Sequence, residues 1–155
     1  MNEKHGPDNS IRVLLADDHT LFRQGLRRLL AEHPRLKIVG EAADAEQAVA
    51  EARRLQPDVV LMDLHMPRGG GIEATRILRS ELPDVGVLIL TVSETEEDLL
   101  AALRAGARGY ILKTSDLDQL LRSLETVAAG QASLGPEMTT KLLTQLSTDE
   151  NAAAR

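Results

Sequence analysis

The sequence predicts an α/β fold, a single doubly wound domain in which five parallel strands are covered by helices on both faces. Short apolar or β-branched runs alternate with longer segments of helical period, and the connections between them are only a few residues long. The runs VLLA, VVLM and VLIL are continuously apolar, which is typical of strands buried on both faces. The 155 residues are 43% hydrophobic, enough for one domain with a substantial core.

The first half of the chain carries two predicted strands and two predicted helices. Ile11–Ala16 is a buried strand, and the segment after it has apolar residues at helical spacing, namely Phe22, Leu26, Leu29 and Leu30. Leu36–Gly40 is a second, weaker strand. Asp44 and Gln47 then form a capping-box pattern before a helix whose apolar face is Ala45, Ala48, Val49 and Ala52.

The second half continues the alternation with three more strands, Asp58–Met62, Val85–Leu90 and Gly109–Leu112. A turn-rich segment, residues 66–71, leads into the third helix. The next two helices have start and stop signals, Thr95 with Gly106 and Ser115 with Gly130. Beyond them, Pro136 is predicted to open a short helix with one apolar side, Met138, Leu142, Leu143 and Leu146.

Composition excludes several classes of function. The formal net charge is −6, and Phe22 and Tyr110 are the only aromatic residues, so we expect no nucleic-acid binding by this fragment. The absence of cysteine excludes disulfides, thiolate zinc sites and cysteine nucleophiles. No apolar run approaches the roughly 20 residues of a membrane span, and the polar start is not a signal peptide. A cytoplasmic domain with no membrane contact and a disordered tail over residues 1–9 is therefore expected.

Polar side chains follow four of the five predicted strands. Asp17 and Asp18 end the first strand, Asp63 the third, Thr91 the fourth and Lys113 the fifth. In a parallel sheet these ends lie at the same edge, where ligands bind. Close carboxylates repel one another by about 4 kcal/mol per pair at an effective dielectric constant near 20. Such a group needs a cation, and an all-oxygen donor set favours Mg²⁺.

A divalent ion beside a carboxylate, with a lysine and a hydroxyl opposite, is suited to bind a phosphoryl group. The metal and the ammonium neutralise phosphoryl oxygens, and positioning supplies most of the catalysis. The central carboxylate can act as nucleophile and become an aspartyl phosphate.

With these residues in place, the chain resembles the receiver domain of two-component response regulators, particularly the NarL/FixJ group with LuxR-type outputs. The matching stretches are LLADDHTLFRQGLRRLL, DVVLMDLHMPRGGGIEATR, VLILTVS and GARGYILK, which agree with that family in order and spacing. The resemblance covers about residues 10–130. It implies the flavodoxin-like receiver fold, with strand order 2-1-3-4-5.

The resemblance also implies a role for each site residue. Asp63 would be the phosphoacceptor and a ligand to Mg²⁺. Asp18 would ligate the ion directly, Asp17 largely through water, and His65 through its backbone carbonyl. The phosphoryl group would be held by two further side chains, Lys113 and Thr91.

Tyr110 would be the switch aromatic that moves inward together with Thr91. Thr114 departs from the family pattern, because many receivers have proline after the lysine, and the isomer of the preceding peptide is left open. His5, His19 and His33 are interpreted as solvated residues without a role.

The expected partner is a sensor histidine kinase that donates from a phosphohistidine, although small donors such as acetyl phosphate could serve. We expect no enzymatic activity beyond the domain's own phosphoryl transfer and dephosphorylation. A phosphorylation-dependent homodimer is implied as well. Residues 131–155 are interpreted as a linker, and the DNA-binding output domain of the NarL/FixJ group as absent, which favours an excised receiver over a single-domain regulator.

Simpler interpretations stay open for each residue alone. The acidic pair, Asp17 and Asp18, could cap a helix, and Asp63 could be a turn residue. The other three, Thr91, Tyr110 and Lys113, could be ordinary strand-end side chains. A haloacid-dehalogenase-like phosphatase also uses an aspartate, a hydroxyl, a lysine and Mg²⁺. Its usual Asp-x-Asp motif is broken here by His65, and its nucleophile ends the first strand rather than the third. A phosphate-independent interaction module is the second alternative.

Overall fold

The computed structural model describes residues 9–153 and confirms the predicted α/β fold class. The strands β1 to β6 span Ile11–Ala16, Leu36–Ala42, Val59–Met62, Gly86–Thr91, Gly109–Leu112 and Ser133–Leu134. The helices α1 to α6 span Thr20–Ala31, Ala45–Leu55, Gly70–Glu81, Glu96–Ala105, Leu117–Ala128 and Pro136–Ala153. Apart from Asn9, the predicted N-terminal tail lies outside the described residues.

The described part of the sheet has six parallel strands in the order β2-β1-β3-β4-β5-β6, so the predicted count of five was wrong. The first five strands follow the expected order. The additional strand, β6, pairs with β5 through only two residues, Ser133 opposite Gly109 and Leu134 opposite Tyr110. Two residues are too few for hydrophobic periodicity to reveal a strand.

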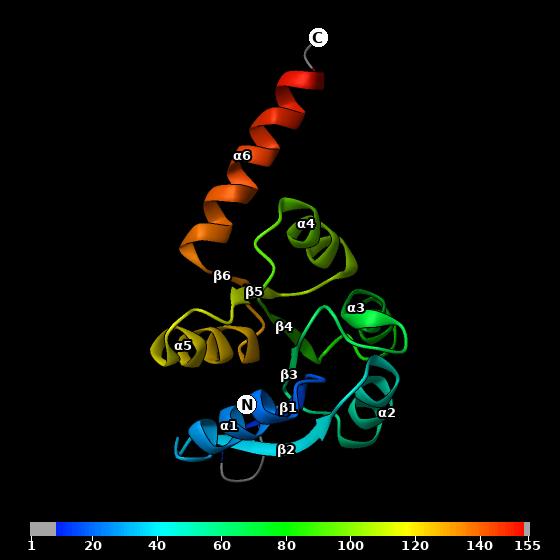
Figure 1. The fold of residues 1–155 in the computed structure, drawn as a ribbon, viewed down its shortest axis with the longest axis vertical. Helices are drawn as coiled ribbons and strands as arrows, with labels where there is room; N and C mark the ends of the chain where they lie inside the picture. The colour runs from blue at the N-terminus through cyan, green and yellow to red at the C-terminus, as the bar shows by residue number, and fades with distance from the viewer. Residues whose placement is uncertain (1–8, 154–155) are drawn as a thin grey trace.

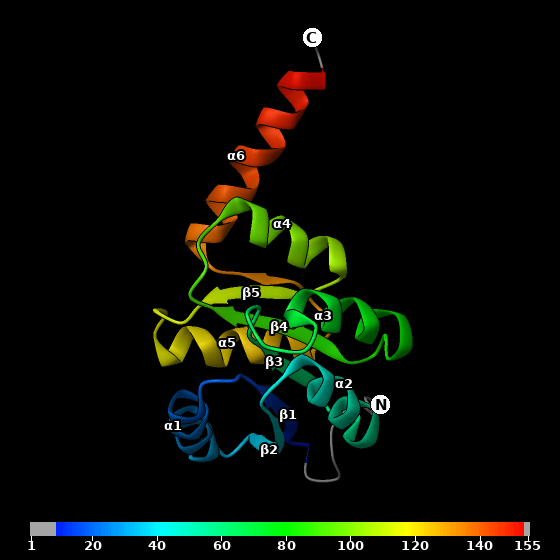
Figure 2. The ribbon, with the colours of Figure 1, turned by 45° about the vertical axis from the view of Figure 1, so that its right-hand side comes forward.

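Two helical layers cover the sheet, with α1 and α5 on one face and α2, α3 and α4 on the other (Figures 1 and 2). Side chains alternate between the faces along each strand. The α1/α5 face carries Val13, Leu15, Val59, Leu61, Leu88, Leu90 and Ile111. The α2–α4 face carries Leu14, Ala16, Val60, Met62, Val87, Ile89, Tyr110 and Leu112. Strands β1, β3, β4 and β5 are therefore buried on both faces, as the continuous apolar runs predicted.

Helix caps fix where the strand-end loops stop. The Asp44 carboxylate accepts a hydrogen bond from the Gln47 amide at 2.7 Å, which starts α2, and the Thr95 hydroxyl accepts one from the Asp98 amide, which starts α4. Helix α5 is capped by Asp116, not by Ser115 as predicted. Adjacent Ser and Asp are both good capping residues, and the sequence pattern alone does not separate them.

Helix α6 begins at Pro136 and spans 18 residues, well beyond the short helix that the sequence suggested. Its first turns pack beside α4 with Met138 fully buried, and the helix then extends away from the domain (Figure 1). Within the described chain, every helix is too short or too polar to cross a membrane.

Candidate functional site

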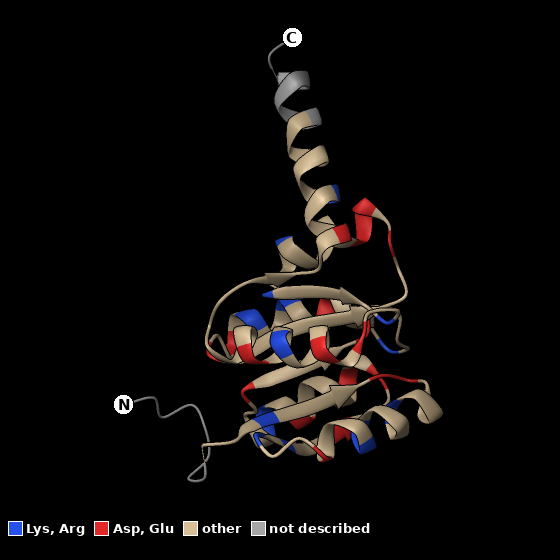
Figure 3. Cartoon of the chain, turned by 90° about the vertical axis from the view of Figure 1, so that its left-hand side faces the viewer, with Lys and Arg blue, Asp and Glu red and all other residues tan. Residues whose placement is uncertain are grey.

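The candidate site lies at the carboxyl-terminal edge of the sheet. Figure 3 shows acidic segments on the loops beyond the arrowheads of the strands. Hydrogen bonds between neighbouring strands continue into these loops, since the Asp17 amide donates to the carbonyl of Ala42 and the Asp63 amide donates to the carbonyl of Ala16, both at 3.0 Å. The second bond holds the two acidic loops side by side, and the first ties the Asp17 loop to the end of β2.

Strand alternation divides the polar residues between two sides of the site. Asp17, Asp63 and Lys113 each follow at even spacing from residues on the α1/α5 face, whereas Thr91 and Tyr110 share the spacing of residues on the α2–α4 face. The charged groups therefore gather near α1, and the hydroxyl groups lie toward α4.

Three aspartates and a histidine form a compact cluster. Asp17, Asp18, His19 and Asp63 each offer one ligand atom, and these atoms lie within 4.8 Å of one another. The His19 Nδ1 atom is 3.1 Å from Asp17 Oδ1, 3.4 Å from Asp18 Oδ1 and 3.9 Å from Asp63 Oδ2. Sequence reasoning missed this placement of His19, although its position directly after the acidic pair was a signal.

The cluster has the donors of a hard-cation site. The Oδ1 atom of Asp18 is buried and accepts no hydrogen bond from the described residues. A buried carboxylate oxygen without a partner is costly unless a cation or water satisfies it. The three carboxylates therefore fit a divalent ion such as Mg²⁺, which keeps several waters and binds through few protein oxygens.

Lys113 lies inside the acidic cluster. Its Nζ atom is 2.6 Å from Asp17 Oδ2 and donates a hydrogen bond to Asp63 Oδ2 at 3.2 Å, and its side chain is only 10% exposed. Burial alone would lower the pKa of the ammonium, but the hydrogen bonds and the charges of the two aspartates outweigh burial and raise it above the ordinary value. The ammonium thus stays charged and balances part of the acidic charge.

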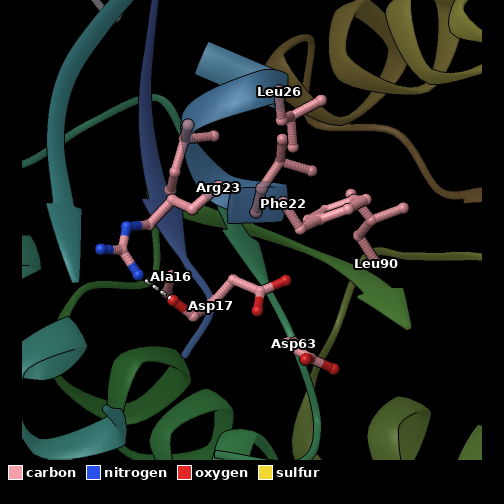
Figure 4. Close-up of a pocket in the computed structure, with 9 residues that line it drawn as sticks. Ala16, Asp17, Phe22, Arg23, Leu26, Asp63 and Leu90 are labelled. Atoms are coloured by element: carbon pink, nitrogen blue, oxygen red, sulfur yellow. Dashed lines mark hydrogen bonds between the residues drawn. The ribbon is translucent and has the colours of Figure 1, made fainter. Parts of the chain in front are cut away.

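Arg23 of α1 secures the first acidic loop. Its guanidinium donates through Nη1 to the backbone carbonyl of Asp17, the dashed bond in Figure 4, and its Nε donates to Glu41 on β2 at 2.9 Å. Burial would raise the pKa of Glu41, but bonds and charge from Arg27 and Arg23 lower it below the ordinary value. The ion pairs of Arg23 and Arg27 with Glu41 thus tie α1 to β2, beside the loop that carries Asp17.

The loop after Asp63 is held by a close backbone contact with α3. The Gly71 amide donates to the carbonyl of Leu64 at 2.8 Å, and a Cβ atom on Gly71 would lie 2.2 Å from the carbonyl oxygen of Asp63. Only glycine fits there without moving the loop. Gly71, the last of three consecutive glycines, thus has a steric role beside the acidic site.

Thr91 and Tyr110 are both fully buried on the α4 side. The Thr91 hydroxyl accepts a hydrogen bond from the Ser93 amide at 3.3 Å, and the Tyr110 hydroxyl donates to the Ser93 carbonyl at 3.0 Å. Burial raises the pKa of Tyr110 to about 12. Tyr110 is thus in an inward position, linked to the loop that carries Thr91.

The side chain of His65 faces outward. It is 63% exposed, and its Nε2 atom lies 3.4 Å from Asp98 Oδ2 at the start of α4. The Ser93 hydroxyl donates to the same carboxylate. Sequence reasoning assigned only the backbone carbonyl of His65 and missed this bridge between the β3–α3 loop and α4. The Lys113–Thr114 peptide, whose isomer the sequence left open, is trans.

A small pocket opens between α1 and the strand ends (Figure 4). The carboxylates of Asp17 and Asp63 are at its polar end, and Phe22 and Leu26 of α1 with Leu90 of β4 form its apolar wall. The Phe22 ring also contacts Lys113, since the Nζ atom lies 4.3 Å from its centroid. Acidic, cationic and aromatic groups therefore meet at one place.

Comparison with known proteins identifies a family with this sequence. Residues 13–125 match the family described as the response regulator receiver domain. The transcriptional regulatory protein DegU of Brevibacillus brevis is 41% identical over 143 residues, 92% of this chain and 60% of DegU. The nitrate/nitrite response regulator NarL of Escherichia coli is 38% identical over 134 residues, 86% of this chain and 62% of NarL. The chain thus spans about 60% of these relatives.

Solved structures agree with this match. A LuxR-family response regulator from Aurantimonas sp. SI85-9A1 superposes with a TM-score of 0.84 at 38% identity, covering 89% of this chain and 99% of that one. The signal receiver domain of a NarL from Mycobacterium tuberculosis gives a TM-score of 0.77 at 32% identity, covering 79% of this chain and 99% of that one.

Proposed function

Because this chain belongs to the response regulator receiver domain family, we propose that Asp63 accepts a phosphoryl group, with Mg²⁺ bound beside it, and that the domain relays the change to a transcriptional output. One observation carries the proposed role of Asp63: its buried carboxylate belongs to the acidic cluster with Asp17 and Asp18 and accepts a hydrogen bond from the Lys113 ammonium at 3.2 Å. Phosphoryl transfer needs positive charge beside the phosphoryl oxygens; Lys113 offers one such charge next to this carboxylate, and a cation held by the three aspartates would add the other.

In the proposed site, Asp18 and Asp63 would hold Mg²⁺ together with the backbone carbonyl of His65, and Asp17 would hold it largely through water. When bound, the ion neutralises charge on the carboxylates and on the phosphoryl oxygens. The Oδ1 atom of Asp18 supports this set because it is a buried acceptor that receives no hydrogen bond, although His19 Nδ1 lies 3.4 Å away.

The reaction itself uses the side chain of Asp63. One carboxylate oxygen attacks the phosphorus of the donor, an acyl phosphate bond forms, and the bond to the leaving group breaks. The leaving group is the imidazole of a histidine kinase or the acetate of acetyl phosphate. Lys113, which pairs with Asp17 and Asp63 before transfer, then moves its ammonium to the new phosphoryl oxygens.

The switch uses the opposite side of the site. Thr91 exchanges its bond with the Ser93 amide for a bond to the phosphoryl group, worth about 1.5–3 kcal/mol. Moving an equilibrium from 1:99 to 99:1 requires about 5.5 kcal/mol of differential binding. Thr91 therefore acts together with Lys113 and with the Tyr110–Ser93 bond, which fastens the same loop over the buried ring.

The partners follow from the family. We propose a sensor histidine kinase as donor, and an output domain that follows residues 10–130 through the helix α6. Among the structural neighbours, RcsB is described as dimers bound to DNA. By analogy, a phosphorylation-dependent homodimer and DNA binding by a longer form of this protein are part of the proposal.

Intact-mass spectrometry after incubation with acetyl phosphate tests the function. We expect the mass of one phosphoryl group per chain with Mg²⁺ present, and none without Mg²⁺ or in Asp63→Asn. Continuous turnover of a phosphomonoester, without stable labelling, would instead favour the phosphatase. No labelling under any condition would favour the phosphate-independent module.

A further inference from the structure

Both aromatic residues of the chain lie at the candidate site, and one of them has no part in the mechanism above. Tyr110 belongs to the switch. Phe22 belongs to α1, where its ring is half-buried against the apolar core of the α1/α5 face. Figure 4 shows the ring beside Leu90, on the far side of the pocket from Arg23.

The ring of Phe22 faces the ammonium of Lys113. The Nζ atom lies 4.3 Å from the ring centroid, within the roughly 6 Å over which the negative face of a ring attracts a cation. On its other side the ammonium meets Asp17 at 2.6 Å and Asp63 at 3.2 Å. With only 10% of the lysine side chain exposed, the ring takes the place of part of its water shell.

These contacts differ in what happens to them when a phosphoryl group arrives. Once a metal ion and the phosphoryl group occupy the carboxylates, Lys113 loses its present partners and must turn to the phosphoryl oxygens. The ring is uncharged and binds neither the metal ion nor the phosphoryl group, so its face stays available to the ammonium through this change. Without the ring, the flexible side chain of Lys113 would be free to turn its strongly hydrated ammonium toward solvent.

We propose that Phe22 is a positioning residue that keeps the Lys113 ammonium beside Asp63 through a cation–π contact, and so speeds phosphoryl transfer. This inference rests on the proposed function. It predicts that the electronic character of the ring matters, and not only its volume. A ring that served packing alone would tolerate any change that kept its shape.

The sequence allows a sharp test, because Phe22 is its only phenylalanine. Biosynthetic replacement of phenylalanine by mono-, di- and trifluorinated analogues changes only this residue, weakening the negative face of the ring at nearly constant shape. The rate of Asp63 phosphorylation by acetyl phosphate at saturating Mg²⁺ should fall stepwise along the series. Phe22→Leu should lower this rate by about two- to thirty-fold, the range expected for a cation–π contact. Phe22→Trp, which keeps an aromatic face, should react at about the rate of the parent chain.

A matched control lies on the same helix. Leu21 is 86% exposed, and Leu21→Ala should leave the rate unchanged. A second measurement needs no phosphorylation: the sequence has four lysines, at positions 4, 37, 113 and 141, so selective labelling gives few ε-methylene signals in NMR. The Lys113 signal should be shifted upfield by the ring current, and this shift should disappear in Phe22→Leu.

The outcomes separate this inference from the proposed function. A flat rate across the fluorinated series in a chain that still becomes phosphorylated, or an unshifted Lys113 signal, overturns the role of Phe22 alone. A parent chain that takes up no phosphoryl group overturns both.

Discussion

Replacing Lys113 by methionine tests how the acidic site is balanced without metal. The ammonium lies 2.6 Å from Asp17 Oδ2 and 3.2 Å from Asp63 Oδ2, in carboxylates that are only 9% and 5% exposed. At an effective dielectric constant near 20, these distances correspond to attractions of about 6 and 5 kcal/mol before desolvation is subtracted. Breaking a buried ion pair by removing one partner typically costs about 3–5 kcal/mol. We expect Lys113→Met to lose that much free energy of unfolding in metal-free buffer, measured by urea denaturation.

Magnesium should reverse part of this loss. A ligand at a hundredfold excess over its Kd stabilises the folded state by about 2.7 kcal/mol. Removal of the ammonium also removes a charge that repels the ion, so Mg²⁺ should stabilise Lys113→Met more than the parent chain. Lys37→Met is the control, because Lys37 is an exposed residue of β2 and should change stability by less than about 0.5 kcal/mol. A metal-free Lys113→Met chain within about 1 kcal/mol of the parent would refute this view of the site.

Three further predictions concern the switch and the loop. Thr91→Ala should still take up phosphate from acetyl phosphate but lose the phosphorylation-dependent shift of the β4–α4 loop. Fluorescence of Tyr110, the only tyrosine, reports that shift because its hydroxyl is bonded to Ser93 of the loop; equal fluorescence responses in both chains would refute the coupling. Ultraviolet titration should give one phenol transition near pH 12, and a transition near pH 10 would contradict the burial of Tyr110. Because the pKa of Tyr110 is raised in the folded state, the stability that its neutral phenol contributes is present below about pH 10 and is lost toward pH 12. Gly71→Ala should lower the free energy of unfolding by about 1–3 kcal/mol in urea denaturation, because its Cβ would lie 2.2 Å from the carbonyl oxygen of Asp63. Gly25→Ala is the control, because the space around Gly25 is open and the change should not destabilise α1.

The sequence predicted the parts of the fold that repeat over many residues. The continuous apolar runs of β1, β3 and β4 indicated strands buried on both faces, and the polar residues that follow them indicated one shared edge. Features set by one or two residues were missed. Strand β6 is two residues long, and the cap of α5 lies one residue beyond the predicted serine.

Contacts between layers could not be predicted from spacing within one element. His19 is exposed, as expected from the sequence, but its ring also lies beside three aspartates because α1 begins directly after Asp17 and Asp18. The contact between Phe22 and Lys113 joins residues 91 positions apart. The bridge from His65 to Asp98 likewise depends on where α4 packs relative to the β3–α3 loop.

The most direct test of the account is to locate the phosphoryl group after reaction with acetyl phosphate and Mg²⁺. Borohydride reduction of the acyl phosphate, followed by peptide sequencing in the mass spectrometer, marks the modified aspartate. The account predicts the label at Asp63 alone, and its loss in Asp63→Asn. A label on Asp17 or Asp18 in the unchanged chain, or on a residue outside this edge of the sheet, would contradict it.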